Sequence, residues 1–150
     1  MTGRLHHGLV DIVRSVEAER LIERVAAYLK ANTSVKPPAW AMFAKTSVAR
    51  EEPPKNPDWW FVRAASMLRK LYLRGPIGVS RMRKFYGGRH RPGMSPPYFA
   101  RGSGAVVRKI LQQLEGAGLV ATVPRKGRVL TPTGKKVLEQ AAKALAGKKS

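Results

Sequence analysis

The sequence predicts a single, mainly α-helical domain that carries one β-hairpin near its C-terminal end. Three observations lead to this prediction. Four segments, at about residues 16–31, 58–73, 103–116 and 134–146, repeat apolar residues at helical spacing. Two short β-rich runs flank a glycine-containing turn between the last two segments. The length of 150 residues suits one domain with a single core.

The N-terminal third of the chain is predicted to hold one helix and a long connection. Ser15 can cap the helix at 16–31, because a serine side chain accepts a hydrogen bond from the first helical turn. Five prolines interrupt residues 35–58, which leaves room only for a short helix around residues 39–43. Trp40 is expected to pack into the core. Residues 1–15 and 147–150 are expected to be flexible.

The helix at 58–73 combines a broad apolar face with a cationic one, and Asp58 can serve as its N-cap. The apolar side is expected to enter the core: Trp60, Phe61, Ala64, Ala65, Met67, Leu68, Leu71 and Tyr72. The opposite side is expected to form an exposed stripe: Trp59, Arg63, Ser66, Arg69 and Lys70. An aromatic ring among cations suits RNA, because the ring stacks on a base while the cations meet phosphates. For Trp59, burial against Trp60 is an equal alternative.

Residues 74–104 form a long basic loop rich in glycine and proline, in which no helix or strand is predicted. A loop of this length is uncommon unless it is functional or disordered. Its seven bases are typical of segments that become ordered against RNA: Arg74, Arg81, Arg83, Lys84, Arg89, Arg91 and Arg101. At least two of its aromatic residues are expected to anchor it to the core instead: Phe85, Tyr86, Tyr98 and Phe99.

The helix at 103–116 is predicted to start at Ser103 as its N-cap and to end near Gly116 and Gly118. Five apolar residues point inward: Val106, Val107, Ile110, Leu111 and Leu114. Three polar residues point outward: Arg108, Lys109 and Gln112.

The hairpin is predicted from β-rich runs at 119–123 and 128–130 around a turn at 124–127. Its tip is basic because it carries Arg125, Lys126 and Arg128. Thr133 can cap the final helix at 134–146.

The charge distribution is strongly asymmetric. The chain has 29 Lys and Arg against nine Asp and Glu, for a net charge of +20. Twelve bases and no acid lie between Asp58 and Glu115, whereas residues 1–58 carry a net charge of only +2. A solvated face normally mixes both signs. The sequence therefore predicts a surface that binds a polyanion, of which nucleic acid is the commonest.

Other locations and partners fit the sequence less well. No stretch approaches the 18 apolar residues of a transmembrane helix, and no helix has the strongly apolar outer face of a membrane-surface module. The first residues lack the apolar core of a signal peptide. The absence of cysteine fits a reducing cytoplasm.

Catalysis and metal binding are also disfavoured. There is no cysteine to act as nucleophile or thiolate ligand, and His6, His7 and His90 lack the spacing of metal ligands. The acids lie at helix starts and in linkers, and not as a close pair in separated environments. We therefore expect no enzyme activity, cofactor, metal or small-molecule substrate.

The order helix, helix, basic helix, hairpin, helix is that of a winged helix, a helix-turn-helix variant whose hairpin forms the wing. Here it would be modified by an extra N-terminal helix and the long basic loop. The segments LEGAGLV at 114–120 and GRVLTPTG at 127–134 resemble winged-helix repressors. A DNA-binding transcription regulator, which reads base edges with its recognition helix, is therefore the alternative to an RNA-binding protein.

A more specific resemblance rests on four ordered motifs: WWFVRAAS at 59–66, LYLRG at 71–75, YGGR at 86–89 and FARGS at 99–103. With the hairpin, they resemble the S19e family of archaeal and eukaryotic small-subunit ribosomal proteins over about residues 17–146. The chain departs from the family pattern at Gly104, where many members carry a basic residue. Residues 1–15 match nothing in the family, so no role is assigned to them.

This resemblance implies a modified winged helix in the head of the small ribosomal subunit, bound to ribosomal RNA (rRNA) and needed for subunit maturation. It also implies neighbouring head proteins as partners and a cytoplasmic, ribosome-associated location. Taken with the charge pattern, it gives seventeen candidate RNA contacts: Trp59, Arg63, Ser66, Arg69, Lys70, Arg74, Arg81, Arg83, Lys84, Arg89, Arg91, Arg101, Arg108, Lys109, Arg125, Lys126 and Arg128.

Overall fold

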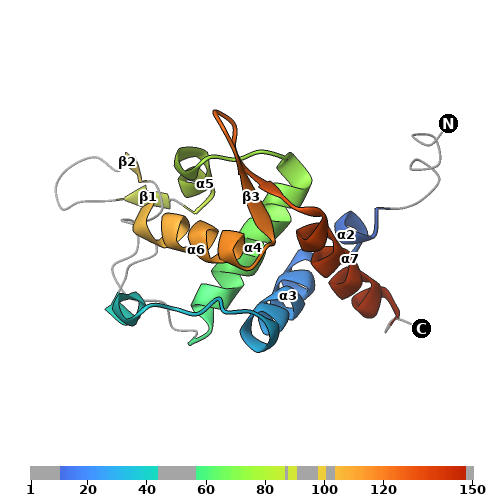
Figure 1. Ribbon diagram of the computed structural model, residues 1–150. Helices are drawn as coiled ribbons and strands as arrows, with labels where there is room; N and C mark the ends of the chain where they lie inside the picture. Colours follow the sequence, from blue (N-terminus) through green and yellow to red (C-terminus); the bar gives the residue numbers. More distant parts are fainter. Residues whose placement is uncertain (1–10, 44–56, 87, 91–97, 101–103, 148–150) are drawn as a thin grey trace.

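A computed structural model of the chain describes residues 11–43, 57–86, 88–90, 98–100 and 104–147, and confirms a mainly helical fold with a β-hairpin (Figure 1). The elements follow in this order: α2 (Ile12–Ser15), α3 (Ala18–Asn32), the 3-10 helix η1 (Ala39–Phe43), α4 (Trp59–Arg74), α5 (Val79–Phe85), β1 (Gly88–His90), β2 (Tyr98–Ala100), α6 (Gly104–Gly116), β3 (Val120–Val123), β4 (Gly127–Leu130) and α7 (Pro132–Gly147).

Helix α4 forms the centre of the core. It contacts α3, α6, α7 and β4, and in Figure 1 it crosses the middle of the molecule. Its predicted apolar face is buried: Trp60, Phe61, Ala64, Ala65, Met67, Leu68 and Leu71. Each large apolar side chain buried in this way contributes roughly 1.5–3 kcal/mol. The surrounding elements are therefore held together largely through α4.

Strands β3 and β4 form the predicted antiparallel hairpin, in which Val120 pairs with Leu130. The hairpin is fixed to the segment after α4, because Ile77 and Arg128 exchange backbone hydrogen bonds of 3.0 and 2.9 Å. Gly127 permits this close approach, since a Cβ atom there would lie 2.5 Å from the backbone of Ile77. The tip of the hairpin projects away from the helices (Figure 1).

Residues 11–15 were expected to belong to a flexible tail, but they form the start of the described fold. Helix α2 packs on α7, and Asp11 is its N-cap, with an Oδ1 atom that accepts the Val13 N–H at 3.1 Å. The expectation fails because a four-residue helix is too short to show a helical repeat in the sequence.

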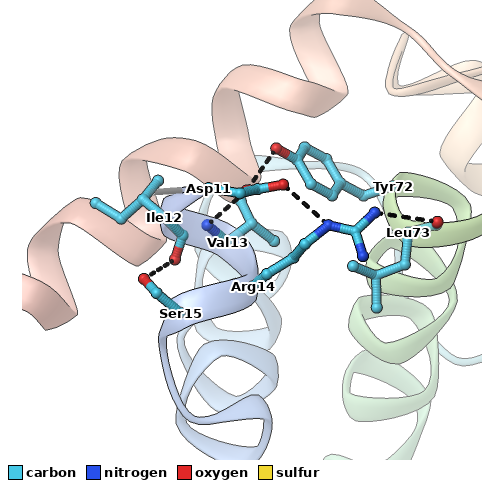
Figure 2. A network of polar contacts seen from close by, with 7 residues as sticks. All are labelled: Asp11, Ile12, Val13, Arg14, Ser15, Tyr72 and Leu73. Atoms are coloured by element: carbon cyan, nitrogen blue, oxygen red, sulfur yellow. Dashed lines mark hydrogen bonds and ion pairs between the residues drawn. The ribbon is translucent and has the colours of Figure 1, made fainter. Parts of the chain in front are cut away.

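Asp11 also ties α2 to the C-terminal end of α4 (Figure 2). Its carboxylate accepts the Tyr72 hydroxyl and the Arg14 Nε, each at 3.0 Å. Arg14 in turn donates to the carbonyl oxygen of Leu73 at 3.3 Å. Burial, together with the hydrogen bond from the Tyr72 hydroxyl to Asp11, raises the pKa of Tyr72 to about 12. The network thus clamps the first described residues onto the central helix.

The expectation that residues 74–104 contain no helix or strand is wrong. They include α5 and the antiparallel pair β1–β2, with Arg89 opposite Phe99. Helix α5 has only seven residues, and tertiary packing around the buried Met82 supports it where local propensity is weak. Residues 87, 91–97 and 101–103 lie outside the described residues.

Two of the predicted N-caps are displaced along the chain. Helix α3 begins after Glu17, which makes no side-chain cap, and Ser15 donates to the Ile12 carbonyl in α2 instead. Helix α7 is capped by Thr131, whose Oγ1 accepts the Gly134 N–H at 3.1 Å, and not by Thr133. Pro132 then occupies the first helical position, where its missing N–H costs nothing.

Two further N-cap predictions have different outcomes. Asp58 stands at the N-cap of α4 but makes no side-chain cap, and its Oδ1 accepts Lys30 Nζ from α3 at 3.0 Å. Ser103 lies outside the described residues, and α6 begins at Gly104.

Candidate nucleic-acid interface

The cationic side of α4 is covered, and not openly exposed as the sequence predicted. Tyr86 lies over it, with the Arg63 guanidinium carbon 4.1 Å from the centre of the Tyr86 ring. The hydroxyls of Tyr86 and Ser66 are hydrogen-bonded at 2.7 Å. The predicted stripe is therefore half-buried, because the end of α5 packs on it. This packing confirms that Phe85 and Tyr86 anchor the basic segment to the core.

Phe85 extends the same contact towards the end of α4. Lys70 Nζ lies 5.2 Å from the centre of the Phe85 ring, and the Arg74 guanidinium carbon lies 4.8 Å from it. Cations are attracted to the negative face of an aromatic ring, so two rings partly offset the crowding of several positive charges. The described residues leave the Nε of Arg69 buried without a hydrogen-bond partner. Within the described residues, this side of α4 therefore holds several cations close together.

The pKa values of two groups reflect this environment. Burial lowers the pKa of Lys70 from its usual value, and the neighbouring Arg69, Arg74 and Arg63 lower it further. Burial raises the pKa of Tyr86 to about 12, against the opposing effects of Ser66 and Arg63. Both shifts indicate a partly desolvated layer between α4 and α5, because burial disfavours the charged form of each group.

Helix α6 presents Arg108, Lys109 and Gln112 to solvent, as predicted. Arg83 from α5 and Arg108 converge at Gly104, the first residue of α6. A Cβ atom at Gly104 would lie 3.2 Å from Arg108 Nη1 and 3.4 Å from Arg83 Nε. The first turn of a helix also presents unpaired N–H groups and a positive dipole end. The glycine thus leaves room for two guanidinium groups where an anion is already favoured.

The hairpin tip adds two exposed cations, Arg125 and Lys126. Arg125 has a φ of +67°, a left-handed conformation that residues other than Gly, Asn and Asp rarely adopt. Arg128 differs from both, since it is half-buried and its Nε lies 4.0 Å from Glu115 Oε1. Of the three predicted tip residues, two are therefore open to solvent.

Six exposed cations on three elements form what we call the basic surface: Arg81 and Lys84 on α5, Arg108 and Lys109 on α6, and Arg125 and Lys126 at the hairpin tip. Arg74 at the end of α4 is also exposed. Arg89 lies on β1, whereas Arg91 and Arg101 lie outside the described residues.

The sequence predicted the surroundings of the tryptophans only in part. Trp59 packs with its ring 5.4 Å from that of Trp60 but is only half-buried, so neither burial nor an RNA contact is decided for it. Trp60 donates from Nε1 to Gln113 Oε1 at 2.8 Å. Trp40, expected in the core, is 42% exposed and touches Trp60 edge-on, with the ring centres 5.7 Å apart. Its place in a short, proline-flanked helix gives it only one buried side.

No group of three or more potential metal ligands occurs in the described part of the chain. Within the same residues, no helix is long and apolar enough to cross a membrane.

Comparison with known proteins identifies the family of the chain. The family model described as ribosomal protein S19e matches residues 12–148. The chain belongs to the ribosomal protein S19e family. Three relatives carry the name small ribosomal subunit protein eS19. That of Aeropyrum pernix is 52% identical over 132 residues, which cover 87% of this chain and 86% of the relative.

The S19e relatives also include eukaryotic proteins. That of Oryza sativa subsp. japonica is 42% identical over 87% of this chain and 89% of its own length. That of Mya arenaria is 40% identical over 92% of this chain and 93% of its own length. The resemblance inferred from the four sequence motifs is thereby confirmed. The match begins at Ile12, the first residue of α2, and not near residue 17 as predicted, so the expectation that residues 1–15 match nothing is wrong for residues 12–15.

Proposed function

We propose that the protein is a structural component of the small ribosomal subunit that binds rRNA in the subunit head and supports subunit maturation and assembly. The observation that carries this proposal is the basic surface, in a chain of the S19e family. Residues 57–86 and 104–130 together hold twelve bases and two acids. Cations spread over several elements suit phosphate contacts along a folded RNA, which is recognised mainly by shape and backbone.

We also propose that α4, α5, α6 and the β3–β4 hairpin form a modified winged helix. In this arrangement α6 is the recognition helix and the hairpin is the wing. The antiparallel bridge between Ile77 and Arg128 supports it, because it joins the segment between α4 and α5 to the wing. Helices α2 and α3 are additions that cover the far side of α4.

A DNA-binding regulator would use the same exposed residues of α6. The spread of cations over α5 and the hairpin tip favours RNA, because base readout by one helix does not require it. Ribosomal RNA and neighbouring proteins of the subunit head are therefore the proposed partners, at a cytoplasmic ribosome. The role is structural and involves no catalysis.

The test compares two exposed lysines on helices, Lys109 on α6 and Lys143 on α7. Lys109→Glu should weaken binding to small-subunit rRNA fragments at least tenfold, whereas Lys143→Glu should change it less than twofold. If the protein contacts six to ten phosphates, raising the salt concentration from 50 to 200 mM should also reduce the affinity of the wild type roughly a thousandfold or more. Equal effects of the two substitutions, or tight binding to a single DNA operator only, would contradict the proposal.

A further inference from the structure

Helices α3 and α7 lie side by side and enclose a groove of about 830 Å³. Three small residues line it: Ala27 on α3, and Ala141 and Ala144 on α7. Tyr28 forms part of its wall and is 37% exposed, which makes it one of two large hydrophobic residues that the described chain leaves open to solvent. The groove therefore offers apolar contact area that the described chain does not cover.

The dimensions of the groove suit a helix. Its α3 side extends from Arg20 to Asn32, which corresponds to about 18 Å at a rise of 1.5 Å per residue. A third helix can pack against a pair of neighbouring helices when small residues allow their axes to come within about 8–10 Å. A helix of about three turns would thus fill the groove along its length.

The charge of the surrounding surface selects the kind of partner. Residues 11–32 carry four acids and four bases, and α7 adds three lysines and one glutamate. Arg20, Arg24 and Glu23 line the groove, so its rim presents both signs. Nucleic-acid binding requires an excess of cations, whereas protein interfaces combine an apolar centre with a polar rim of mixed charge. A protein segment therefore fits this groove better than RNA does.

We propose that the α3–α7 groove docks an amphipathic helix of a neighbouring small-subunit protein, with the helix's apolar side chains over the alanines and its charged residues against the rim. The inference rests on the proposed place of the protein in the small subunit, and it does not depend on the basic surface.

The experiment places a photoreactive benzoylphenylalanine at Tyr28 in the full chain, assembled into small subunits that are then purified and irradiated. We expect a nuclease-resistant adduct with one identified small-subunit protein. The same probe at Lys109 should give a nuclease-sensitive adduct with RNA. An RNA adduct at position 28, or no adduct there in subunits that show the Lys109 adduct, would overturn the proposal. Loss of the Lys109 adduct alone would count against the proposed RNA interface and leave the groove proposal standing.

A matched pair of variants separates the groove from the rest of α3. Ala27 lines the groove, whereas Ala31, one turn later, is exposed and does not. Combined with the probe, Ala27→Arg should reduce the protein adduct at position 28 at least fivefold, and Ala31→Arg should leave it within twofold. Because both variants add one positive charge to an exposed site, equal effects would show that the groove itself is not the contact.

Discussion

Helices α3 and α4 pack against each other across the core, yet their outer faces differ in charge. Residues 11–32 balance four acids with four bases, whereas residues 57–86 set seven bases against one acid. The first group pairs charges locally, as between Arg14 and Asp11 at 3.0 Å. The second places Arg63 and Lys70 against aromatic rings. The comparison indicates that the charges of residues 11–32 balance, whereas residues 57–86 carry an excess of positive charge that a bound anion would offset.

The largest expected loss of stability comes from a substitution in the core that both faces share. Leu68 on α4 is fully buried, so Leu68→Ala should lower the free energy of unfolding by roughly 2–5 kcal/mol. Urea unfolding followed by circular dichroism measures this loss. Binding to rRNA at equal folded concentration should be unchanged. A variant that unfolds normally but binds weakly would mean that Leu68 belongs to the interface.

A smaller loss of stability is expected from a substitution on the charge-balanced side, residues 11–32. Asp11→Ala removes the N-cap of α2 together with the acceptor of Tyr72 and Arg14, which should cost about 1–2 kcal/mol. Asp11→Asn is the control, because an amide oxygen can still cap the helix and accept the Tyr72 hydroxyl. Thermal melting should rank wild type above Asn and Asn above Ala. A reduced rRNA affinity in either variant would break the separation of the two faces.

Because of the layer between α4 and α5, the stability of the protein should depend on pH in the alkaline range. Because the pKa of Tyr86 rises from 10.0 to about 12 on folding, the neutral phenol is favoured in the folded state. Its contribution to stability is full below pH 10 and is lost as the pH rises towards 12. Tyr86→Phe should cost about 1 kcal/mol near neutral pH through the lost hydrogen bond to Ser66, and should lose stability less steeply between pH 10 and 12.

Ser66→Ala is the control for that experiment, because it removes the same hydrogen bond but keeps the titrating phenol. Unfolding free energies measured from pH 8 to 12 distinguish the two variants. Parallel curves for Tyr86→Phe and wild type would mean that the phenol is not desolvated by folding.

The smallest expected change in stability is a gain and not a loss. Arg125→Gly relieves the left-handed backbone at φ +67°, and should raise stability by less than about 1 kcal/mol once the entropy of glycine is included. It should also weaken rRNA binding, because one exposed cation is lost. Arg125→Lys keeps the charge and the strain, so its melting temperature and affinity should match wild type. Loss of stability in the glycine variant would contradict the role of strain here.

Sequence periodicity located the long helices well, because each buries a continuous apolar stripe. The inward residues of α6, from Val106 to Leu114, are all buried as predicted. The hairpin and the end of α6 also follow from local rules. Gly118 adopts a φ of +81°, and the Leu119 N–H donates to the Leu114 carbonyl in a Schellman cap.

Short elements were missed, because a segment of four to seven residues contains at most two helical turns. The sequence of α5 gives no helical signal, and its place depends on Met82 beneath it and on Tyr86 beside α4. The N-caps shifted by two residues for a similar reason. Ser15 and Thr133 are as suitable chemically as the residues used, and packing decided where each helix begins.

By itself, the sequence determined the charge of the protein, its long helices, its hairpin and its family. Those properties depend on residue type and local spacing. The tertiary structure alone decided that Arg63 and Lys70 lie beneath aromatic rings and that Arg83 meets Arg108 beside Gly104. It also decided that α3 and α7 together line a groove. These features join residues far apart in the chain, so they depend on how the helices pack, and no periodicity within one helix encodes that arrangement.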